Sequence, residues 1–94
     1  MPKSKRKQYK GIKMCSKYEV EYAKYLDKRK IKWEYKPKKF DLQNGLSFEP
    51  DFYLLEEDEY IELRINWTKE HITYYKLFKK LFASMNIRLE NIKK

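Results

Sequence analysis

This 94-residue chain is organised around the sequence EPDFYLLEEDEYIELR, residues 49–64. On either side of the acidic segment 56–59, apolar and polar side chains alternate. Such alternation is typical of short strands, and a run of acidic residues between two of them is typical of a turn. We therefore expect a hairpin here, with the rest of the chain packed around it.

The polar residues of this hairpin are expected to gather on one face, because successive side chains of a strand point to opposite faces. The apolar set consists of Phe52 and Leu54 on the first strand and Ile61, Leu63 and Ile65 on the second. If these face the core, Asp51, Glu62 and Arg64 meet on the opposite face near the open end of the hairpin. Two carboxylates held close together repel each other, and a cation between them relieves that repulsion.

This spacing resembles the signature of the PD-(D/E)XK nucleases, the restriction-endonuclease-like superfamily. The family pattern is Pro-Asp, a short hairpin, then Asp or Glu, any residue and Lys. Here Pro50-Asp51 is followed, after ten residues, by Glu62-Leu63-Arg64. The chain departs from the pattern at Arg64, where the family usually has Lys.

The resemblance implies metal-dependent hydrolysis of DNA phosphodiester bonds, with double-stranded or branched DNA as substrate. Asp51 and Glu62, with the backbone carbonyl of Leu63, would hold Mg²⁺, or Mn²⁺ in its place, through hard oxygen ligands. In the family, the motif Lys orients the attacking water or stabilises the charge on the phosphate. Arg64 can donate two hydrogen bonds to a phosphate but cannot act as a base, because a guanidinium stays protonated.

Arg64 therefore leaves the activity open. The chain would catalyse more slowly, take a lysine from elsewhere in the fold, such as Lys36 or Lys69, or catalyse nothing. In the last case the fold would serve as an inactive DNA-binding module. A small basic RNA-binding protein is a further alternative, which explains the charge but not the acids at one site.

The net charge of +9 is unevenly distributed along the chain. The first seventeen residues contain seven Lys or Arg and no acid, so the remaining seventy-seven residues carry only +2. Clustered basic residues are typical of proteins that bind polyanions, although solvated loops and a solubilising arm are the alternative. We expect nucleic acid to contact Lys3, Lys5, Arg6, Lys7, Lys10, Lys13, Lys17, Lys36, Lys38, Lys39 and Lys69.

Length and composition predict one small domain, because 41% hydrophobic residues can form a single core. We expect residues 1–15 to form a flexible basic arm and residues 16–94 to form a single nuclease-like domain. The only cysteine, Cys15, excludes an internal disulfide and a Cys-based zinc site. With no apolar run long enough to span a bilayer, a reducing, cytoplasmic setting is expected.

A first helix is expected to begin at Ser16, because Ser16-Lys17-Tyr18-Glu19 matches a capping box. Glu19 lies on the apolar side of this helix, where two roles remain open. Its carboxylate either caps the helix amides in return or points into a site on the sheet. The resemblance favours the second role, with Glu19 holding the metal through water, because family members place a Glu on this helix.

The remaining periodicity completes an α/β arrangement of the α+β type, and the resemblance implies helices flanking a four-stranded mixed sheet. Strands are expected over residues 31–35, 40–42, 46–55, 60–65 and 86–90, and a second helix is expected to follow Thr68. Its apolar stripe includes His71, expected to cover the edge of the core. The order of elements resembles the minimal αβββαβ core of the nuclease superfamily. Small members of that family act as homodimers, which the resemblance implies here as well.

Overall fold

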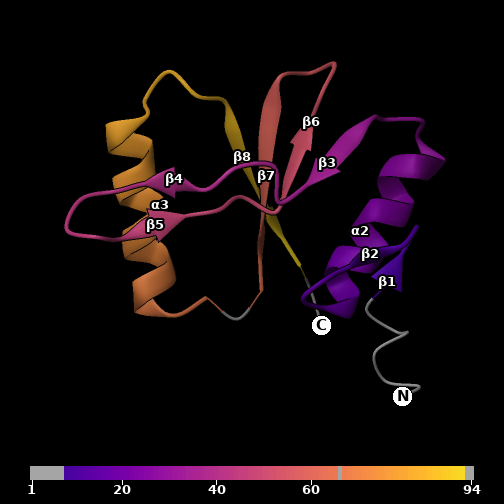
Figure 1. Ribbon diagram of the computed structural model, residues 1–94, viewed down its shortest axis with the longest axis horizontal. Coiled ribbons are helices and arrows are strands. Elements are labelled where there is room, and N and C mark those ends of the chain that lie inside the picture. The colour runs from indigo at the N-terminus through magenta and orange to yellow at the C-terminus, as the bar shows by residue number, and fades with distance from the viewer. Residues whose placement is uncertain (1–7, 66, 93–94) are drawn as a thin grey trace.

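The computed structural model describes residues 8–65 and 67–92, and its central element is a mixed sheet of four strands (Figure 1). The strand order is β3 (Trp33–Tyr35), β6 (Phe52–Leu54), β7 (Glu59–Arg64) and β8 (Ile87–Asn91). The pairs β3–β6 and β6–β7 are antiparallel, whereas β7 and β8 are parallel. A parallel pair needs a crossover connection, and the helix between β7 and β8 provides it.

Two helices flank this sheet, α2 (Lys17–Lys28) on one side and α3 (Lys69–Leu81) on the other (Figure 1). The main elements therefore follow the order helix, three strands, helix, strand. Both helices begin at the end of the sheet where β7 ends, in the lower part of Figure 1. This end consequently receives the positive ends of two helix dipoles.

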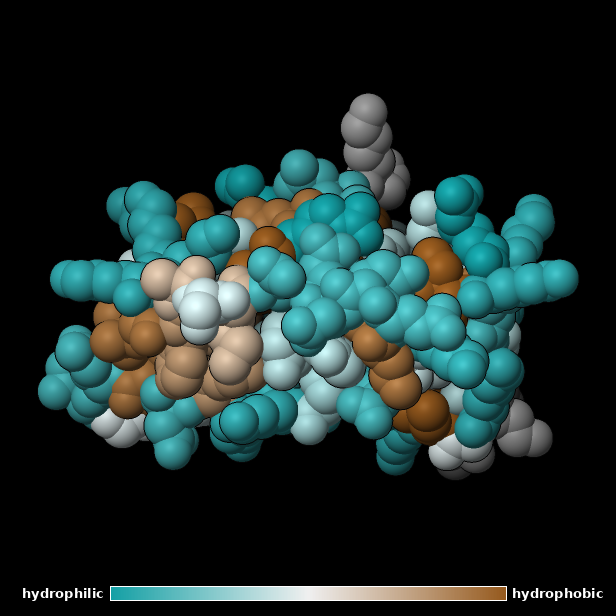
Figure 2. Space-filling view, turned by 90° about the horizontal axis from the view of Figure 1, so that it is seen from above, coloured by the Kyte–Doolittle hydropathy of each residue, from teal (hydrophilic) through white to brown (hydrophobic). Residues whose placement is uncertain are grey.

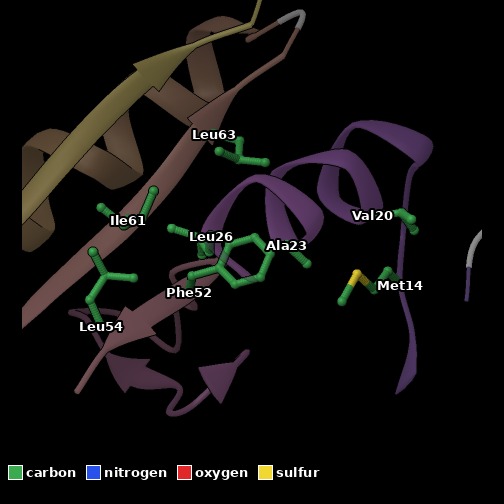
Figure 3. Packing of buried hydrophobic residues seen from close by; sticks show 8 residues of the cluster. All are labelled: Met14, Val20, Ala23, Leu26, Phe52, Leu54, Ile61 and Leu63. Carbon is green, nitrogen blue, oxygen red and sulfur yellow. The ribbon is translucent and has the colours of Figure 1, made fainter. Parts of the chain in front are cut away.

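The period-two alternation of the hairpin sorts its residues between two hydrophobic clusters. Phe52, Leu54, Ile61 and Leu63 face α2 and pack with Val20, Ala23, Leu26 and Met14 (Figure 3). On the other face, Tyr60 packs against a cluster that contains Phe40 together with Phe78 of α3. Phe52 and Phe78 are completely buried, and burying a side chain of that size contributes roughly 2 kcal/mol of stability. The apolar set of the hairpin faces the core as expected, but the opposite face of the sheet is covered by a second hydrophobic cluster.

Some of the residues expected to form strands 40–42 and 46–55 contribute to a second hairpin, separate from the main sheet. β4 (Phe40–Asp41) and β5 (Ser47–Phe48) pair with each other, outside the main sheet, and β5 packs against α3. The stretch 46–55 was expected to be one strand, but it divides at Pro50 into β5 and β6. Proline has no amide hydrogen to donate to a ladder and interrupts a strand in this way.

The expectation of a flexible arm over residues 1–15 is wrong for residues 8–15. β1 (Gln8–Tyr9) and β2 (Ile12–Lys13) form a third hairpin that packs on α2, and Met14 is buried in the core. The high positive charge of this segment had suggested an unstructured arm, but Tyr9 and Ile12 are apolar and pack against the hydrophobic cluster formed by α2 and the β6–β7 hairpin, here called the α2 cluster. Residues 1–7 lie outside the described part of the chain.

Asp27 fastens this N-terminal hairpin to the domain. Its carboxylate accepts hydrogen bonds from the Tyr9 hydroxyl (2.6 Å) and the Trp33 indole (2.9 Å), and it pairs with the Lys10 ammonium at 2.8 Å. The bonds from Lys10, Tyr9 and Trp33 together lower the pKa of Asp27 to about 2. A carboxyl with a lowered pKa stabilises the fold above its normal pKa, and the stabilisation is lost as the pH falls towards 2.

Asp27→Asn is therefore expected to destabilise the protein by about 1 kcal/mol at pH 7, because three donors lose a charged acceptor at a partly exposed position. Urea denaturation measures the loss. The stability difference between variant and wild type should shrink as the pH is lowered from 4 to 2. Asp41→Asn, the same change at an exposed position in β4, serves as the control. An equal effect of both substitutions would contradict the fastening role.

The face of the molecule seen from above carries mainly hydrophilic side chains, and apolar atoms gather towards the α3 side (Figure 2). Among the described residues, no helix has both the length and the apolarity needed to cross a membrane.

Candidate functional site

A cleft of about 420 Å³ is lined by residues of α2, β5, β7 and α3 and by Asp51, which directly precedes β6. Its polar lining includes Glu19, Asp51, Glu62 and Lys36, and its aromatic lining includes Trp67, His71 and Tyr74. Three acids predicted to share a site therefore line one cleft. All three are buried, with exposed fractions of 5% for Glu19, 6% for Asp51 and 9% for Glu62.

Asp51 and Glu62 meet because of the register of the hairpin. Asp51 directly precedes β6, and its amide donates to the Ile61 carbonyl at 3.0 Å, which fixes it beside β7. Glu62 follows Ile61 and therefore points to the opposite face, away from the α2 cluster. That face is covered by the α3 cluster, which is built around Phe40, Phe48 and Phe78. The carboxyl of Glu62 is therefore buried and not solvated. Its juxtaposition with Asp51 is the one that the sequence predicts.

Asp51 is held from two directions. Its Oδ2 accepts from the Leu63 amide at 2.8 Å, and its Oδ1 lies 3.3 Å from the Lys36 ammonium. Burial raises the pKa of Asp51 to about 6; the charge of Glu19 adds to this effect, whereas the Leu63 amide and Lys36 oppose it. Leu63 thus contributes its N–H to the site, and the metal-binding role of its carbonyl stays a prediction.

Glu62 is the least compensated acid of the cleft. Its Oε1 is buried and has no hydrogen-bond partner among the described residues. Burial, followed by the nearby charge of Asp51, raises the pKa of Glu62 to about 9. A buried carboxylate without a partner is costly, so without a bound cation this group is protonated at neutral pH. An unsatisfied buried oxygen of this kind calls for a partner that the protein does not supply.

Glu19 points into the cleft and also serves α2. Ser16 caps the helix by accepting from the Glu19 amide at 3.2 Å. The Glu19 carboxylate does not return the bond to Ser16 as a capping box requires. Its Oε1 instead accepts from the Cys15 amide at 2.8 Å and from the Tyr35 hydroxyl at 2.7 Å. The reciprocal capping role expected for Glu19 is therefore wrong, and its carboxylate lines the cleft, buried beside Asp51 with one oxygen engaged.

Lys36 and Lys69 were the two lysines expected to be able to replace the motif lysine, and Lys36 is the one that lies next to the acids. Its amide donates to the Asp51 carbonyl at 2.9 Å while its ammonium pairs with the Asp51 carboxylate. Its backbone has a φ of 47°, a left-handed conformation that costs a non-glycine residue about 1 kcal/mol or more. Burial lowers the pKa of Lys36, but Asp51 and Glu19 outweigh that effect and raise it above its normal value. Lys36 is therefore a cation at neutral pH.

Arg64 does not join the acids. Its side chain is exposed, and its guanidinium lies over the Trp67 ring, 5.4 Å from the ring centroid. Strand alternation correctly places Arg64 on the same face as Glu62, but the aromatic surface of Trp67 holds the cation outside the cleft lining. The position of Arg64 therefore does not favour the catalytic role that the motif predicts for it.

The basic residues predicted to bind nucleic acid fall into three groups. Lys3, Lys5, Arg6 and Lys7 lie outside the described residues. Lys10, Lys13, Lys17, Lys38, Lys39 and Lys69 are exposed. Lys36 is the member of the described set that lines the cleft, so Lys69 is not the lysine that approaches the acids.

Two site residues were not identified from the sequence. The ring of Tyr35 packs against Phe52, and its hydroxyl donates to Glu19. His71 was expected to cover the edge of the core, yet it is exposed and caps α3, with its Nδ1 accepting from the Thr68 amide at 3.1 Å. The Thr68-x-x-His71 spacing was the available signal for that cap, because it matches a capping box with His in the place of Glu.

The donor set fits a hard divalent cation, although the acids are not arranged as a ready-made cage. Within residues 8–65 and 67–92, no three acidic, imidazole or thiol groups form a cluster that would hold a metal ion as they stand. The reason is visible at Asp51, whose two oxygens are engaged by Leu63 and Lys36. Glu62 Oε1 lacks a partner, and carboxylate oxygen is the ligand that Mg²⁺ and Mn²⁺ prefer. Binding would require the Lys36 ammonium to move off Asp51.

Comparisons of the chain with protein-family models, with curated proteins and with solved structures give no match.

Proposed function

We propose that the protein is a metal-dependent endonuclease that hydrolyses DNA phosphodiester bonds in the cleft at the end of β6 and β7. The observation that carries the proposal is the pairing of two buried carboxyls, Asp51 and Glu62, whose pKa values are both raised. A fold gains nothing in stability from such a pair, because each charge is desolvated and repels the other. Raised pKa values in a cleft are typical of functional groups.

Asp51 and Glu62 would hold Mg²⁺ or Mn²⁺ directly, with Glu19 holding it through water and the Leu63 carbonyl as a further ligand. When bound, the ion would lower the pKa of a water molecule and offset the charge that grows on the phosphate. Tyr35 and the Cys15 amide hold Glu19 Oε1 in place, which leaves its second oxygen for that water. The α2 and α3 N-termini add positive potential at the same end of the sheet.

Lys36 is proposed to take the part that the motif lysine plays in the nuclease superfamily. Because its pKa is raised, its ammonium donates to the non-bridging phosphate oxygens and does not accept the proton of the attacking water. With Asp51 holding the metal ion, the Lys36 ammonium, which now pairs with that carboxylate, would be free to donate to the phosphate. Arg64, stacked on Trp67, is proposed to contact a neighbouring phosphate outside the cleft.

The order of the main elements supports this reading. Helix α2, strands β3, β6 and β7, helix α3 and strand β8 follow the αβββαβ order of the restriction-endonuclease-like core. The predicted motif residues Asp51 and Glu62 stand at the positions of that order where the family carries its acids. Homodimerisation, which the resemblance implies, is part of the proposal.

The test is cleavage of supercoiled plasmid and of a four-way DNA junction by the wild-type protein in Mg²⁺, Mn²⁺ or EDTA. We expect nicking or resolution in either metal and none in EDTA. The substrate cut faster identifies linear or branched DNA as the preferred class. An absence of cutting in both metals, with DNA still bound, would overturn the proposal.

Lys36→Met is expected to lower the cleavage rate about a hundredfold, since one charge-assisted donor to the transition state is lost. The same substitution should tighten Mn²⁺ binding, because no ammonium then competes for Asp51. Gel assays of plasmid nicking and Mn²⁺ titrations measure the two effects. Lys38→Met, an exposed lysine two residues along, serves as the control. If Lys36→Met weakened metal binding as well as cleavage, its role would be structural.

The second candidate function is an inactive DNA-binding module with the nuclease fold. The observation that favours it is the Lys36–Asp51 pair, which neutralises one motif acid within the protein, together with the position of Arg64 outside the cleft. Under this alternative, wild-type protein binds DNA without cutting it. The metal titration separates the two, because an inactive module has no need to release Lys36 from Asp51.

A further inference from the structure

A second and larger hollow lies along the open edge of the sheet, at strand β3. It has a volume of about 790 Å³, and we call it the β3-edge groove. Its basic lining consists of Lys10, Lys30, Lys32 and Lys36. Lys36 also lines the catalytic cleft, so the groove and the cleft meet at this residue. Lys30 and Lys32 were not among the residues expected to bind nucleic acid.

The charge of this groove is positive. Its acidic lining is Asp27 and Glu34, and Asp27 is already engaged by Lys10, Tyr9 and Trp33. The Lys32 ammonium lies 3.8 Å from Glu56 at an exposed position, where an ion pair contributes little and exchanges easily. Unlike scattered surface lysines, these four line one concave surface that opens onto the cleft.

Three of the four lysines occupy strained backbone positions. Lys10, Lys30 and Lys36 have φ values of 54°, 61° and 47°. Glycine adopts this conformation without cost, whereas a side chain with a Cβ adopts it at a penalty. Within the described part of the chain, every lysine with positive φ lines the β3-edge groove. Lys10 lies in the two-residue turn between β1 and β2, and Lys30 follows the C-cap of α2, where a left-handed backbone closes the element. At Lys36 the same conformation places the side chain where the groove and the cleft meet.

A protective role for these lysines explains less. Lysines on an edge strand discourage pairing with another sheet, and β3 is an edge strand. Protection accounts for Lys32, which lies directly beside β3. It does not account for Lys10 in the N-terminal hairpin, for the turn residue Lys30, or for the continuity with the cleft through Lys36.

We propose that the β3-edge groove binds the backbone of an unpaired polynucleotide strand that extends from the scissile phosphate. This inference rests on the proposed nuclease function, and it assigns the substrate class as DNA with a single-stranded segment, such as a flap or a branch point. The volume of the groove is in the range of pockets that enclose a small ligand, which suits a few nucleotides of one strand and not a duplex.

Binding in the groove is expected to be independent of base sequence. The rings of Trp33 and Tyr35 are packed against Phe52, at centroid distances of 5.5 and 5.6 Å. Both contacts are edge-on, and both rings also line the groove; a base that stacked on either ring would be held without regard to its identity. Phosphate contacts from lysines position a strand but carry no sequence information.

The test is the salt dependence of binding of a fluorescein-labelled oligothymidylate, measured by anisotropy in EDTA so that no cleavage occurs. The variant is Lys30→Gln/Lys32→Gln, and the matched control is Lys79→Gln/Lys80→Gln on the exposed side of α3. The first pair should reduce the slope of log K against log salt by about 1.4, because each phosphate contact to a single strand contributes about 0.7. The control pair should leave the slope unchanged.

Three results would overturn the groove: an unchanged slope for Lys30→Gln/Lys32→Gln, an equal reduction by the control pair, or an equal reduction when a duplex of the same length replaces the oligothymidylate. Thermal melting of both variants checks that they fold. The experiments distinguish refutation of strand binding in the groove from refutation of the nuclease function. A wild type that cuts DNA while the slope is unchanged refutes only the groove, and a reduced slope without any cutting refutes only the nuclease.

Discussion

Glu62→Gln is expected to lower the rate of metal-dependent DNA cleavage about a thousandfold, since a metal ion contributes several kcal/mol to charge stabilisation in the transition state. Glutamine keeps the size of the side chain and removes only its ability to become an anion. The fold should tolerate the change, because Glu62 has a pKa of about 9 and is already uncharged at neutral pH without a cation. Plasmid nicking in Mg²⁺ measures the loss.

The control for this variant is Glu57→Gln in the exposed turn between β6 and β7. It makes the same chemical change on the same hairpin, away from the cleft, and should leave the cleavage rate unaltered. Asp51→Asn should match Glu62→Gln, because both acids are proposed ligands of one ion. If Glu62→Gln cut DNA at the wild-type rate, the assignment of the acids would be wrong.

The free energy of unfolding is expected to fall as the pH rises from 4 to 9 in the absence of metal, by on the order of a few kcal/mol. The pKa of Asp51 is raised from 3.8 to about 6, and that of Glu62 from 4.5 to about 9. The folded protein therefore binds more protons than the unfolded chain in this range, which makes stability decrease with pH. Lys36 titrates above this range, because its pKa is raised from 10.5.

Millimolar Mg²⁺ should remove most of this decline, because the ion binds the deprotonated carboxyls of the folded state. The expected increase in melting temperature is consequently larger at pH 9 than at pH 5. Calorimetry of wild type and Glu62→Gln, each in Mg²⁺ and in EDTA, measures it. Above pH 6 the variant should show neither the decline nor the response to metal. A wild-type stability that is flat with pH would contradict the burial and mutual repulsion of these acids.

The hairpin over residues 49–64 could be predicted because its information is local. A period of two assigns each residue to a face, and the register then brings Asp51 to Glu62 whatever covers them. The helices were predictable for the same reason, since Ser16 and Thr68 cap them through their immediate neighbours. A structural feature can be predicted from the sequence where the residues that cause it are close neighbours in the chain.

Features that depend on distant partners were not predictable in this way. The N-terminal hairpin looks like a basic arm until Tyr9 and Lys10 meet Asp27, eighteen and seventeen residues away. The turn that brings Lys36 over Asp51 depends on a left-handed backbone that is rare for lysine. Arg64 followed the predicted face, but its final position depends on Trp67 beyond the end of the strand.

The carboxyls of the cleft are proposed to bind a divalent cation together. Titration of Mn²⁺ into the metal-free protein at pH 8, followed by the electron paramagnetic resonance signal of free Mn²⁺, tests this proposal without depending on a substrate. We expect saturable binding by the wild type with release of protons, and loss of that binding in Glu62→Gln. Mn²⁺ that stays free in the presence of wild type, or that binds Glu62→Gln equally well, would contradict it.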